Sequence, residues 1–239
     1  MIAAAAPSPL PGRYAAFFLI LQYCLMLAAY IILSSAINWP VSLDDPANIA
    51  LPRVIAQWPA ILTGYICYGL VAILFIPATA ALNARLGLNG PLAGATVSLA
   101  AVATVAKLIG ICRWLFAMPV LAQAYVQPGA DKATLAVFFD VLNGYAGDIG
   151  EIIGVSLISG VWTIIMGWVI YQTPGRWTKL LGGVVLLTAI LLLLSVPEGF
   201  GLKTIFGFSM GDLLTVNGFT WQHGLLAIGL WSLTPPRKA

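Results

Sequence analysis

Charged residues are scarce in this chain. Asp, Glu, Lys and Arg together make up 8% of its 239 residues, against about 25% in a typical soluble domain. Apolar residues reach 61% of the chain, and the mean hydropathy is +0.98. This composition excludes an ordinary soluble protein and predicts a polytopic membrane protein. Because the loops are short, we expect a single membrane domain over residues 1–239.

Histidine and cysteine are scarce as well. The chain has one histidine, His223, so it lacks the residues for a haem held by two histidines, a His/Cys zinc cluster or a Ser-His-Asp triad. The chain has three cysteines, each alone within an apolar run: Cys24, Cys67 and Cys112. We expect all three to be buried and to pack as small apolar side chains. We predict no catalytic and no metal-binding residue, and no cofactor is identified.

Long basic runs are absent too. The net charge is +3, and the basic residues are scattered along the chain. Nucleic-acid-binding arms carry blocks of like charge, so no nucleic-acid partner is expected. The expected partners are the lipid bilayer and, in one interpretation, other membrane subunits.

Six apolar runs reach the roughly 20 residues that a helix needs to cross a bilayer. They cover residues 14–37, 54–82, 92–118, 149–171, 178–197 and 213–233. The first run could be taken for a signal peptide, but its apolar core is far longer than the usual 7–15 or so residues. The prediction is an all-α bundle of six transmembrane helices.

The basic residues predict the orientation of this bundle, because cytoplasmic loops carry an excess of Lys and Arg. One set of segments holds Arg13, Arg85, Arg176, Lys179, Arg237 and Lys238. The other set holds fewer basic residues and several acidic ones, namely Arg53, Lys132, Lys203, Asp44, Asp45, Asp131, Glu198 and Asp212. Both termini are therefore predicted to be cytoplasmic.

The stretch 139–154 carries three carboxylates and four glycines at the start of an apolar run. Asp148 and Glu151 are three residues apart, which places them on one face of an α-helix. Arg113 lies at a matching depth in the preceding run, with Lys107 about 9 Å deeper. An unpaired charge at membrane depth is costly, so we expect Glu151 to contact Arg113 or Lys107, directly or through one water.

This charged cluster has two interpretations. It either neutralises charge where the third and fourth spans pack, or it lines a pocket near the outer face, since intramembrane ionisable groups commonly mark substrate paths. The candidate binding residues are Lys107, Arg113, Asp140, Asn143, Tyr145, Asp148 and Glu151.

Three further segments carry predictions. Residues 131–147 predict an interfacial helix, because Leu135, Phe138, Phe139 and Leu142 form an apolar stripe. The turn-rich segment 38–46 indicates an outer loop or, alternatively, a lid. Polar residues make the last run half polar. Within it, His223 is predicted to be a hydrogen-bonded interior residue, the alternative being a single ligand to a chlorophyll or haem.

Three sequence elements resemble a bacterial membrane family catalogued as domain of unknown function 4386. They are Asn-Trp-Pro with Asp-Asp-Pro after the first run, Arg-Trp-Leu-Phe-Ala-Met-Pro-Val-Leu-Ala-Gln-Ala-Tyr at 113–125, and Gly-Tyr-Ala-Gly-Asp-Ile-Gly-Glu-Ile-Ile-Gly at 144–154. The resemblance covers about residues 14–195. It implies a six-helix protein of the bacterial cytoplasmic (inner) membrane and brings no established activity.

The sequence therefore favours a non-enzymatic membrane protein that serves as a binding or accessory subunit of a larger membrane assembly, since its many glycines suit helix packing. The alternatives are a small-molecule carrier or sensor, or a membrane enzyme acting on a lipid or quinone in the outer pocket. Neither a broken-helix repeat nor a catalytic set is present in the sequence to support these alternatives.

Overall fold

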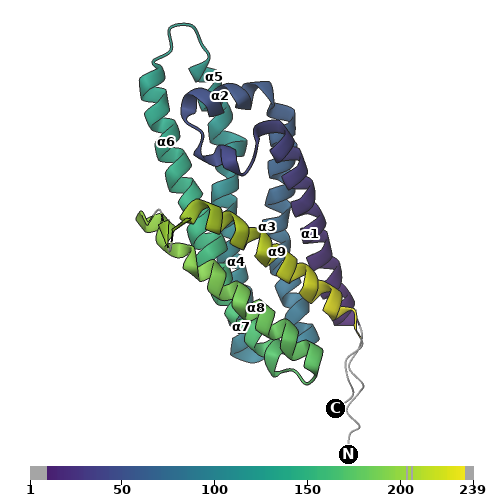
Figure 1. Cartoon of the computed structure of the whole chain (residues 1–239). Coiled ribbons are helices and arrows are strands. Elements are labelled where there is room, and N and C mark those ends of the chain that lie inside the picture. The colour runs from purple at the N-terminus through teal and green to yellow at the C-terminus, as the bar shows by residue number, and fades with distance from the viewer. Residues whose placement is uncertain (1–9, 203, 206, 235–239) are drawn as a thin grey trace, which may run out of the picture.

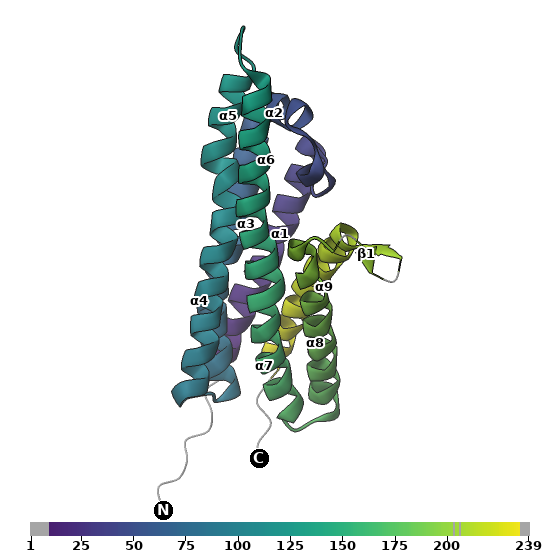
Figure 2. The same ribbon diagram turned by 90° about the vertical axis from the view of Figure 1, so that its left-hand side faces the viewer.

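The computed structural model describes residues 10–202, 204–205 and 207–234, and most of them are helical. Long helices run side by side along the molecule (Figure 1), and Figure 2 shows the same bundle from the side. These helices are α1 (Leu10–Ile37), α3 (Trp58–Leu86), α4 (Gly90–Cys112), α7 (Ser159–Gln172), α8 (Arg176–Leu194) and α9 (Met210–Ser232). The short connecting elements are η1 (Val41–Asp44), α2 (Ala47–Ala56), η4 (Val196–Phe200) and a hairpin of β1 (Thr204–Ile205) and β2 (Phe208–Ser209).

Two rods of joined helices form the tallest part of the molecule. The first consists of α4, the π-helix η2 (Arg113–Ala117) and α5 (Met118–Tyr125), and the second of α6 (Lys132–Asp148), the π-helix η3 (Ile149–Ile158) and α7. They contain 36 and 41 residues, or roughly 54 and 62 Å of helix, whereas the hydrocarbon core of a bilayer is about 30 Å thick. The rods extend well past the upper end of α8, and α2 lies beside their far end (Figure 1).

Five segments are long and apolar enough to cross a membrane, as expected of a multi-pass membrane protein. They are Leu10–Ile37, Trp58–Leu86, Gly90–Tyr125, Lys132–Gln172 and Arg176–Phe200. The sixth apolar run forms α9, whose polar residues Asn217, Gln222 and His223 lower its hydropathy. The helical, multi-pass fold class is confirmed, and the sixth span stays a prediction.

The segment predicted as an interfacial helix has a different orientation. Helix α6 continues the axis of η3 and α7 as one rod (Figure 2) instead of lying across the bundle. Phe139 is buried, and Leu135 and Leu142 pack against the same core, but Phe138 is 56% exposed. Three of the four residues of the apolar stripe therefore face the neighbouring helices, which removes the reason for the helix to lie flat on a membrane.

Helix α6 starts at a well-defined cap outside the apolar part of the rod. The Asp131 carboxylate accepts hydrogen bonds from the Thr134 backbone N–H (3.1 Å) and the Thr134 hydroxyl (2.7 Å). These donors favour the ionised carboxylate and lower the pKa of Asp131. The cap fixes the residue at which the second rod begins.

The core consists of two clusters stacked along the bundle. One gathers around Tyr65, Trp114 and Phe139. The other gathers around Phe75, Trp162 and Trp221. Helix α9 is bound to the second cluster by polar contacts as well, since the Trp221 indole N–H donates to the Thr163 hydroxyl (2.9 Å) and the Asn217 amide donates to the Leu191 carbonyl (2.6 Å). Most of the polar groups that make α9 half polar therefore face the protein.

Glycines allow the two rods to touch along their backbones. A Cβ added to Gly110 of α4 would lie 3.1 Å from the Cα of Gly150 in η3, and one added to Gly154 would lie 3.0 Å from the Lys107 backbone nitrogen. Such contacts leave no room for a side chain. The expected role of the glycines at 150 and 154 in tight packing is therefore confirmed.

The cysteines are less buried than predicted. Cys24 is exposed, Cys67 and Cys112 are half-buried, and all three are free thiols. In a membrane bundle the outer surface faces lipid, so an apolar residue gains little by moving to the interior. This explains why hydrophobic surroundings in the sequence did not predict burial.

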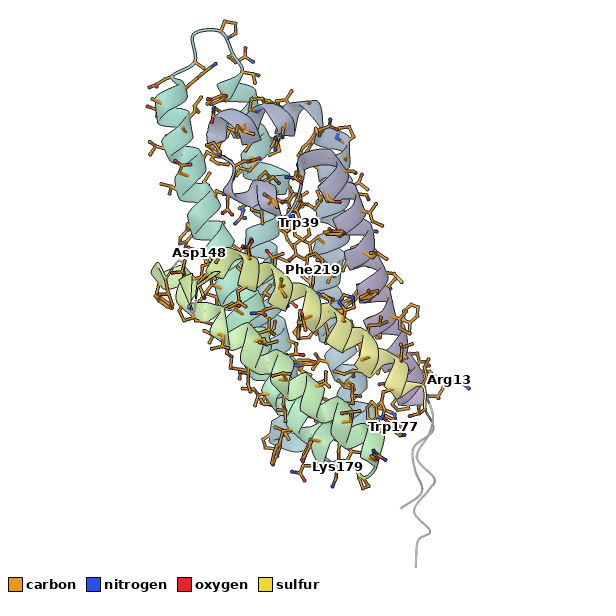
Figure 3. All side chains as sticks on the ribbon, in the orientation of Figure 1. Arg13, Trp39, Asp148, Trp177, Lys179 and Phe219 are labelled. Atoms are coloured by element: carbon orange, nitrogen blue, oxygen red, sulfur yellow. The ribbon has the colours of Figure 1, made fainter. Side chains whose placement is uncertain are left out.

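The start of α1 and the end of α9 lie at the same end of the molecule. Arg85, at the end of α3, donates from Nη2 to the carbonyl of Thr234 (2.9 Å), just after α9. Arg13 and Lys179 also lie at this end, as Figure 3 shows. Three other residues used to predict the orientation, Lys203, Arg237 and Lys238, lie outside the described residues.

We expect Gly110→Ala to lower the free energy of unfolding by about 1–3 kcal/mol, because the added methyl group would push the rods apart. Gly94→Ala in the same helix is the matched control, since nothing lies within 4 Å of its added Cβ. The control should be neutral or gain up to about 1 kcal/mol. Thermal unfolding in mild detergent compares the two, and equal stability would contradict the close contact.

Candidate functional site

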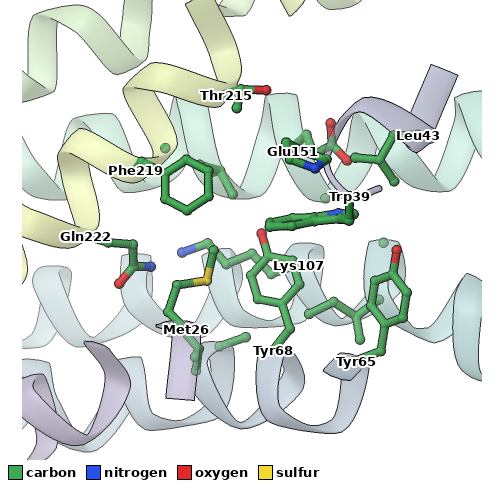
Figure 4. A pocket seen from close by; sticks show the side chains of 18 of the residues that line it. Met26, Trp39, Leu43, Tyr65, Tyr68, Lys107, Glu151, Thr215, Phe219 and Gln222 are labelled. Atoms are coloured by element: carbon green, nitrogen blue, oxygen red, sulfur yellow. The ribbon is translucent and has the colours of Figure 1, made fainter. Parts of the chain in front are cut away.

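A cavity lies where the two core clusters meet, lined by α1, α3, α4, η2, η3, α9 and the loop after α1. It holds about 110 Å³ of space open to the centres of water-sized molecules. Met26, Lys107, Phe219 and Gln222 surround one end, and Trp39, Tyr65 and Glu151 surround the other (Figure 4). The walls are mainly aromatic and aliphatic, with a few polar groups between them.

Both π-helices border this cavity. In η2 the Met118 N–H donates to the Arg113 carbonyl, and the next residue, Pro119, has no N–H to continue the α-helical pattern. In η3 the Ser159 N–H donates to the Gly154 carbonyl. Single π-helical turns are rare and frequently found at functional sites. Here they place Arg113, Trp114 and Glu151 against the cavity.

Arg113 and Glu151 form an ion pair at the edge of the cavity. Arg113 Nη2 lies 3.5 Å from Glu151 Oε1, and Arg113 Nη1 donates to the Asn143 carbonyl (3.0 Å). The Arg113 side chain is 5% exposed and that of Glu151 37%. A side chain at Gly147 would collide with the Arg113 guanidinium. The prediction that Glu151 contacts Arg113 or Lys107 is confirmed for Arg113.

Lys107 has no such acidic partner. It is 7% exposed, and its ammonium lies 4.6 Å from the ring centroid of Phe75 and 4.3 Å from that of Trp221. In the part of the chain that the structure describes, no carboxylate oxygen lies within 4 Å of it and it donates no hydrogen bond. The two rings stabilise the cation through their π-electrons. Within residues 10–202, 204–205 and 207–234, its N–H donors have no acceptor.

Several buried polar atoms around the cavity have no hydrogen-bond partner among the residues that the structure describes. Five belong to lining residues: Gln22 Oε1, Tyr65 Oη, Arg113 Nε, Trp114 Nε1 and Gln222 Oε1. Each buried group left without a hydrogen bond costs about 1–3 kcal/mol. The fold therefore tolerates a loss of stability beside the cavity, where these unpaired polar atoms cluster.

Aromatic side chains form the walls. Trp39, in the loop after α1, makes edge contacts with Tyr68 (5.7 Å between ring centroids) and Phe219 (6.2 Å). At the other end of the same wall, Tyr65 stacks on Trp114 at 5.5 Å. The loop thus covers part of the cavity, and the ion pair of Asp45 with Arg53 ties it to α2.

Four of the predicted site residues do not line the cavity. Asp140, Tyr145 and Asp148 are exposed. Asn143 is half-buried, and its amide donates to the Leu43 carbonyl (2.9 Å), which fastens the loop after α1 to α6. Asp148 is exposed, whereas Glu151 lines the cavity, and the π-helix η3 begins at Ile149, between the two carboxylates.

His223 is exposed and not interior as predicted, although its predicted hydrogen bonds are present. Nδ1 lies 2.8 Å from the Phe219 carbonyl, and Nε2 lies 3.1 Å from the Tyr23 hydroxyl. Both ring nitrogens are engaged, so a haem or chlorophyll could bind here only if one of these bonds broke. Among the described residues, no group of three His, Cys, Asp or Glu forms a metal-ligand set.

The sequence reasoning missed most of the cavity. Gln22 was the clearest available signal, as a polar residue alone within a long apolar run; its amide donates to the Val71 carbonyl at 2.8 Å. The aromatic residues Tyr65, Tyr68 and Phe219 gave no signal, because an aromatic residue that lines a cavity has the same surroundings in sequence as one that fills a core.

We expect Glu151→Gln to destabilise the protein by about 1–3 kcal/mol, because Arg113 would keep a buried charge without its counter-ion. The partial exposure of Glu151 moderates this loss. The double variant Glu151→Gln/Arg113→Gln should recover part of it, as measured by thermal unfolding in a double-mutant cycle. Strictly additive losses would show that the two side chains are not coupled.

The comparisons with known proteins agree with the resemblance noted in the sequence. No curated protein and no solved structure matches the chain. One family model matches residues 15–233, which covers nearly all of the described helices, α9 included. The chain therefore belongs to the family described as Domain of unknown function (DUF4386).

Proposed function

We propose that this protein binds a small molecule in the central cavity, as an intramembrane carrier or sensor. The observation that carries the proposal is Lys107, a buried cation beside the cavity that has no acidic partner among the described residues. A buried charge without a counter-ion costs several kcal/mol. Such a residue is rarely kept within a membrane unless it serves a ligand or ion path.

The two interpretations of the charged cluster apply to different residues. Arg113 and Glu151 pair with each other where the rods pack, which is what a structural role requires. Lys107 faces the cavity, and packing would be served equally well by an apolar side chain of the same length. This difference favours ligand binding over a purely structural cluster.

A second proposal is that the protein is also an accessory subunit of a larger membrane assembly. It is supported by exposed apolar side chains along the far half of the two rods, including Phe116, Val120, Val137 and Val141. The enzyme interpretation has less support, because the cavity-lining residues include no nucleophile hydrogen-bonded to a base.

We further propose six spans, with α9 as the sixth, and both termini in the cytoplasm of a bacterial cell, the protein residing in its inner membrane. An even number of spans agrees with the start of α1 and the end of α9 lying side by side at one end of the bundle, where a side chain at Gly12 would collide with the Ser232 carbonyl. Arg13, Arg85, Arg176 and Lys179 belong to that end, as the excess of basic residues on the cytoplasmic side requires.

Cysteine labelling tests this topology in a background in which Cys24, Cys67 and Cys112 are replaced by alanine. On intact cells, a membrane-impermeant maleimide should label Asp131→Cys and Asp212→Cys. Lys179→Cys and Thr234→Cys should react only after permeabilisation. If Asp212→Cys and Thr234→Cys react from the same side, α9 does not cross the membrane.

Lys107→Met tests the binding function. Removal of an unpaired buried charge should raise the free energy of unfolding of the ligand-free protein by about 1–2 kcal/mol, because the desolvation cost exceeds the lost cation–π attraction. Native mass spectrometry of the wild-type protein should show a bound small molecule that the variant lacks.

Lys179→Met is the matched control for this test, since Lys179 is exposed. It should change stability by less than about 0.5 kcal/mol and keep the bound molecule. If Lys107→Met is destabilised as strongly as Glu151→Gln, Lys107 serves packing and the proposed function fails.

A further inference from the structure

We infer that the cavity binds a monoanionic amphiphile, a monocarboxylate of about ten non-hydrogen atoms, with its carboxylate on the ammonium of Lys107. This inference rests on the proposed function and specifies the chemical class of its ligand. It follows from the charge, the polar groups and the size of the cavity.

The charge of the lining residues defines the charge of the ligand. Among them, the side chains of the types that carry a full charge are Lys107, Arg113 and Glu151, and Arg113 is already paired with Glu151. One positive charge, that of Lys107, remains. Because Lys107 is buried, a single negative charge on the ligand brings the sum to zero, whereas a cation or a dianion would leave an uncompensated charge beside it.

The ammonium of Lys107 contacts two aromatic rings and lines the cavity. Phe75 and Trp221 cover the ammonium at 4.6 and 4.3 Å, and neither ring can accept a strong hydrogen bond. An ammonium has three N–H donors, which a carboxylate accepts in short charge-assisted bonds. Met26 and Gln222 lie at the same end of the cavity (Figure 4).

The rest of the cavity suits an apolar body. Leaving out Lys107, Arg113 and Glu151, its walls are formed chiefly by aromatic and aliphatic side chains, among them Trp39, Tyr68, Ile111 and Phe219. The cavity has a volume of about 110 Å³, and one water-sized group needs about 10–15 Å³ of it. The space therefore holds roughly seven to eleven such groups, close to the size of octanoate.

Equilibrium dialysis of the full-length protein in lipid nanodiscs tests the inference with three probes of equal chain length: octanoate, 1-octanol and octylammonium. We expect the protein to bind octanoate at least about tenfold more tightly than 1-octanol, and octylammonium least. In Lys107→Met, octanoate should lose this advantage, while Lys179→Met should bind as the wild type does. Thermal unfolding of each variant verifies that it is folded, and Lys107→Gln provides a second neutral substitution.

The outcomes separate the inference from the proposed function. If 1-octanol or octylammonium binds as tightly as octanoate, or if Lys107→Met retains the preference for octanoate, the inference is overturned and a binding function stands. If no probe binds while a small molecule copurifies with the wild type, the inference of a monocarboxylate ligand is overturned and the proposed binding function stands. If no probe binds and nothing copurifies, both are overturned.

Discussion

The close approach of α4 and η3 is the contact on which the rest of this structure depends. Gly110 and Gly150 meet backbone to backbone, which brings Arg113 within reach of Glu151 and leaves Lys107 directed into the cavity. Larger residues at this crossing would separate the rods and, with them, the two charged groups that form the edge of the cavity. The glycines thus determine where the polar groups of the membrane interior lie.

The two buried cations illustrate different ways of placing charge in an apolar environment. Arg113 has a carboxylate and a backbone carbonyl as partners, so these groups offset the free-energy cost of burying its guanidinium. Lys107 contacts the faces of two aromatic rings and has no carboxylate partner in the described part of the chain, and the rings compensate less than an ion pair does. Buried polar atoms of Gln22, Tyr65 and Gln222 have no hydrogen-bond partner among the described residues, which lowers the stability of this region further. Buried charged or polar groups without partners are more common at ligand-binding sites than in hydrophobic cores.

The sequence predicted what depends on composition and on pairs of opposite charge. The long apolar runs indicated the helices, and the matching depths of Arg113 and Glu151 indicated their contact. It did not predict features that arise from tertiary geometry. A π-helix begins at Ile149, between Asp148 and Glu151, most of the stripe on α6 faces protein, and the cavity is assembled from aromatic residues of several separate elements. None of these leaves a periodic signal in one sequence.

Under the proposed function, Lys107 holds a ligand that the protein itself does not supply. A cryo-electron microscopy structure of the wild-type protein, purified from its membrane in lipid nanodiscs, tests this proposal. We expect ordered non-protein density in the cavity, with a polar group about 3 Å from Lys107 Nζ. A structure in which a carboxylate of the protein occupies that position, or in which the aromatic walls close over Lys107 and fill the cavity, would contradict it.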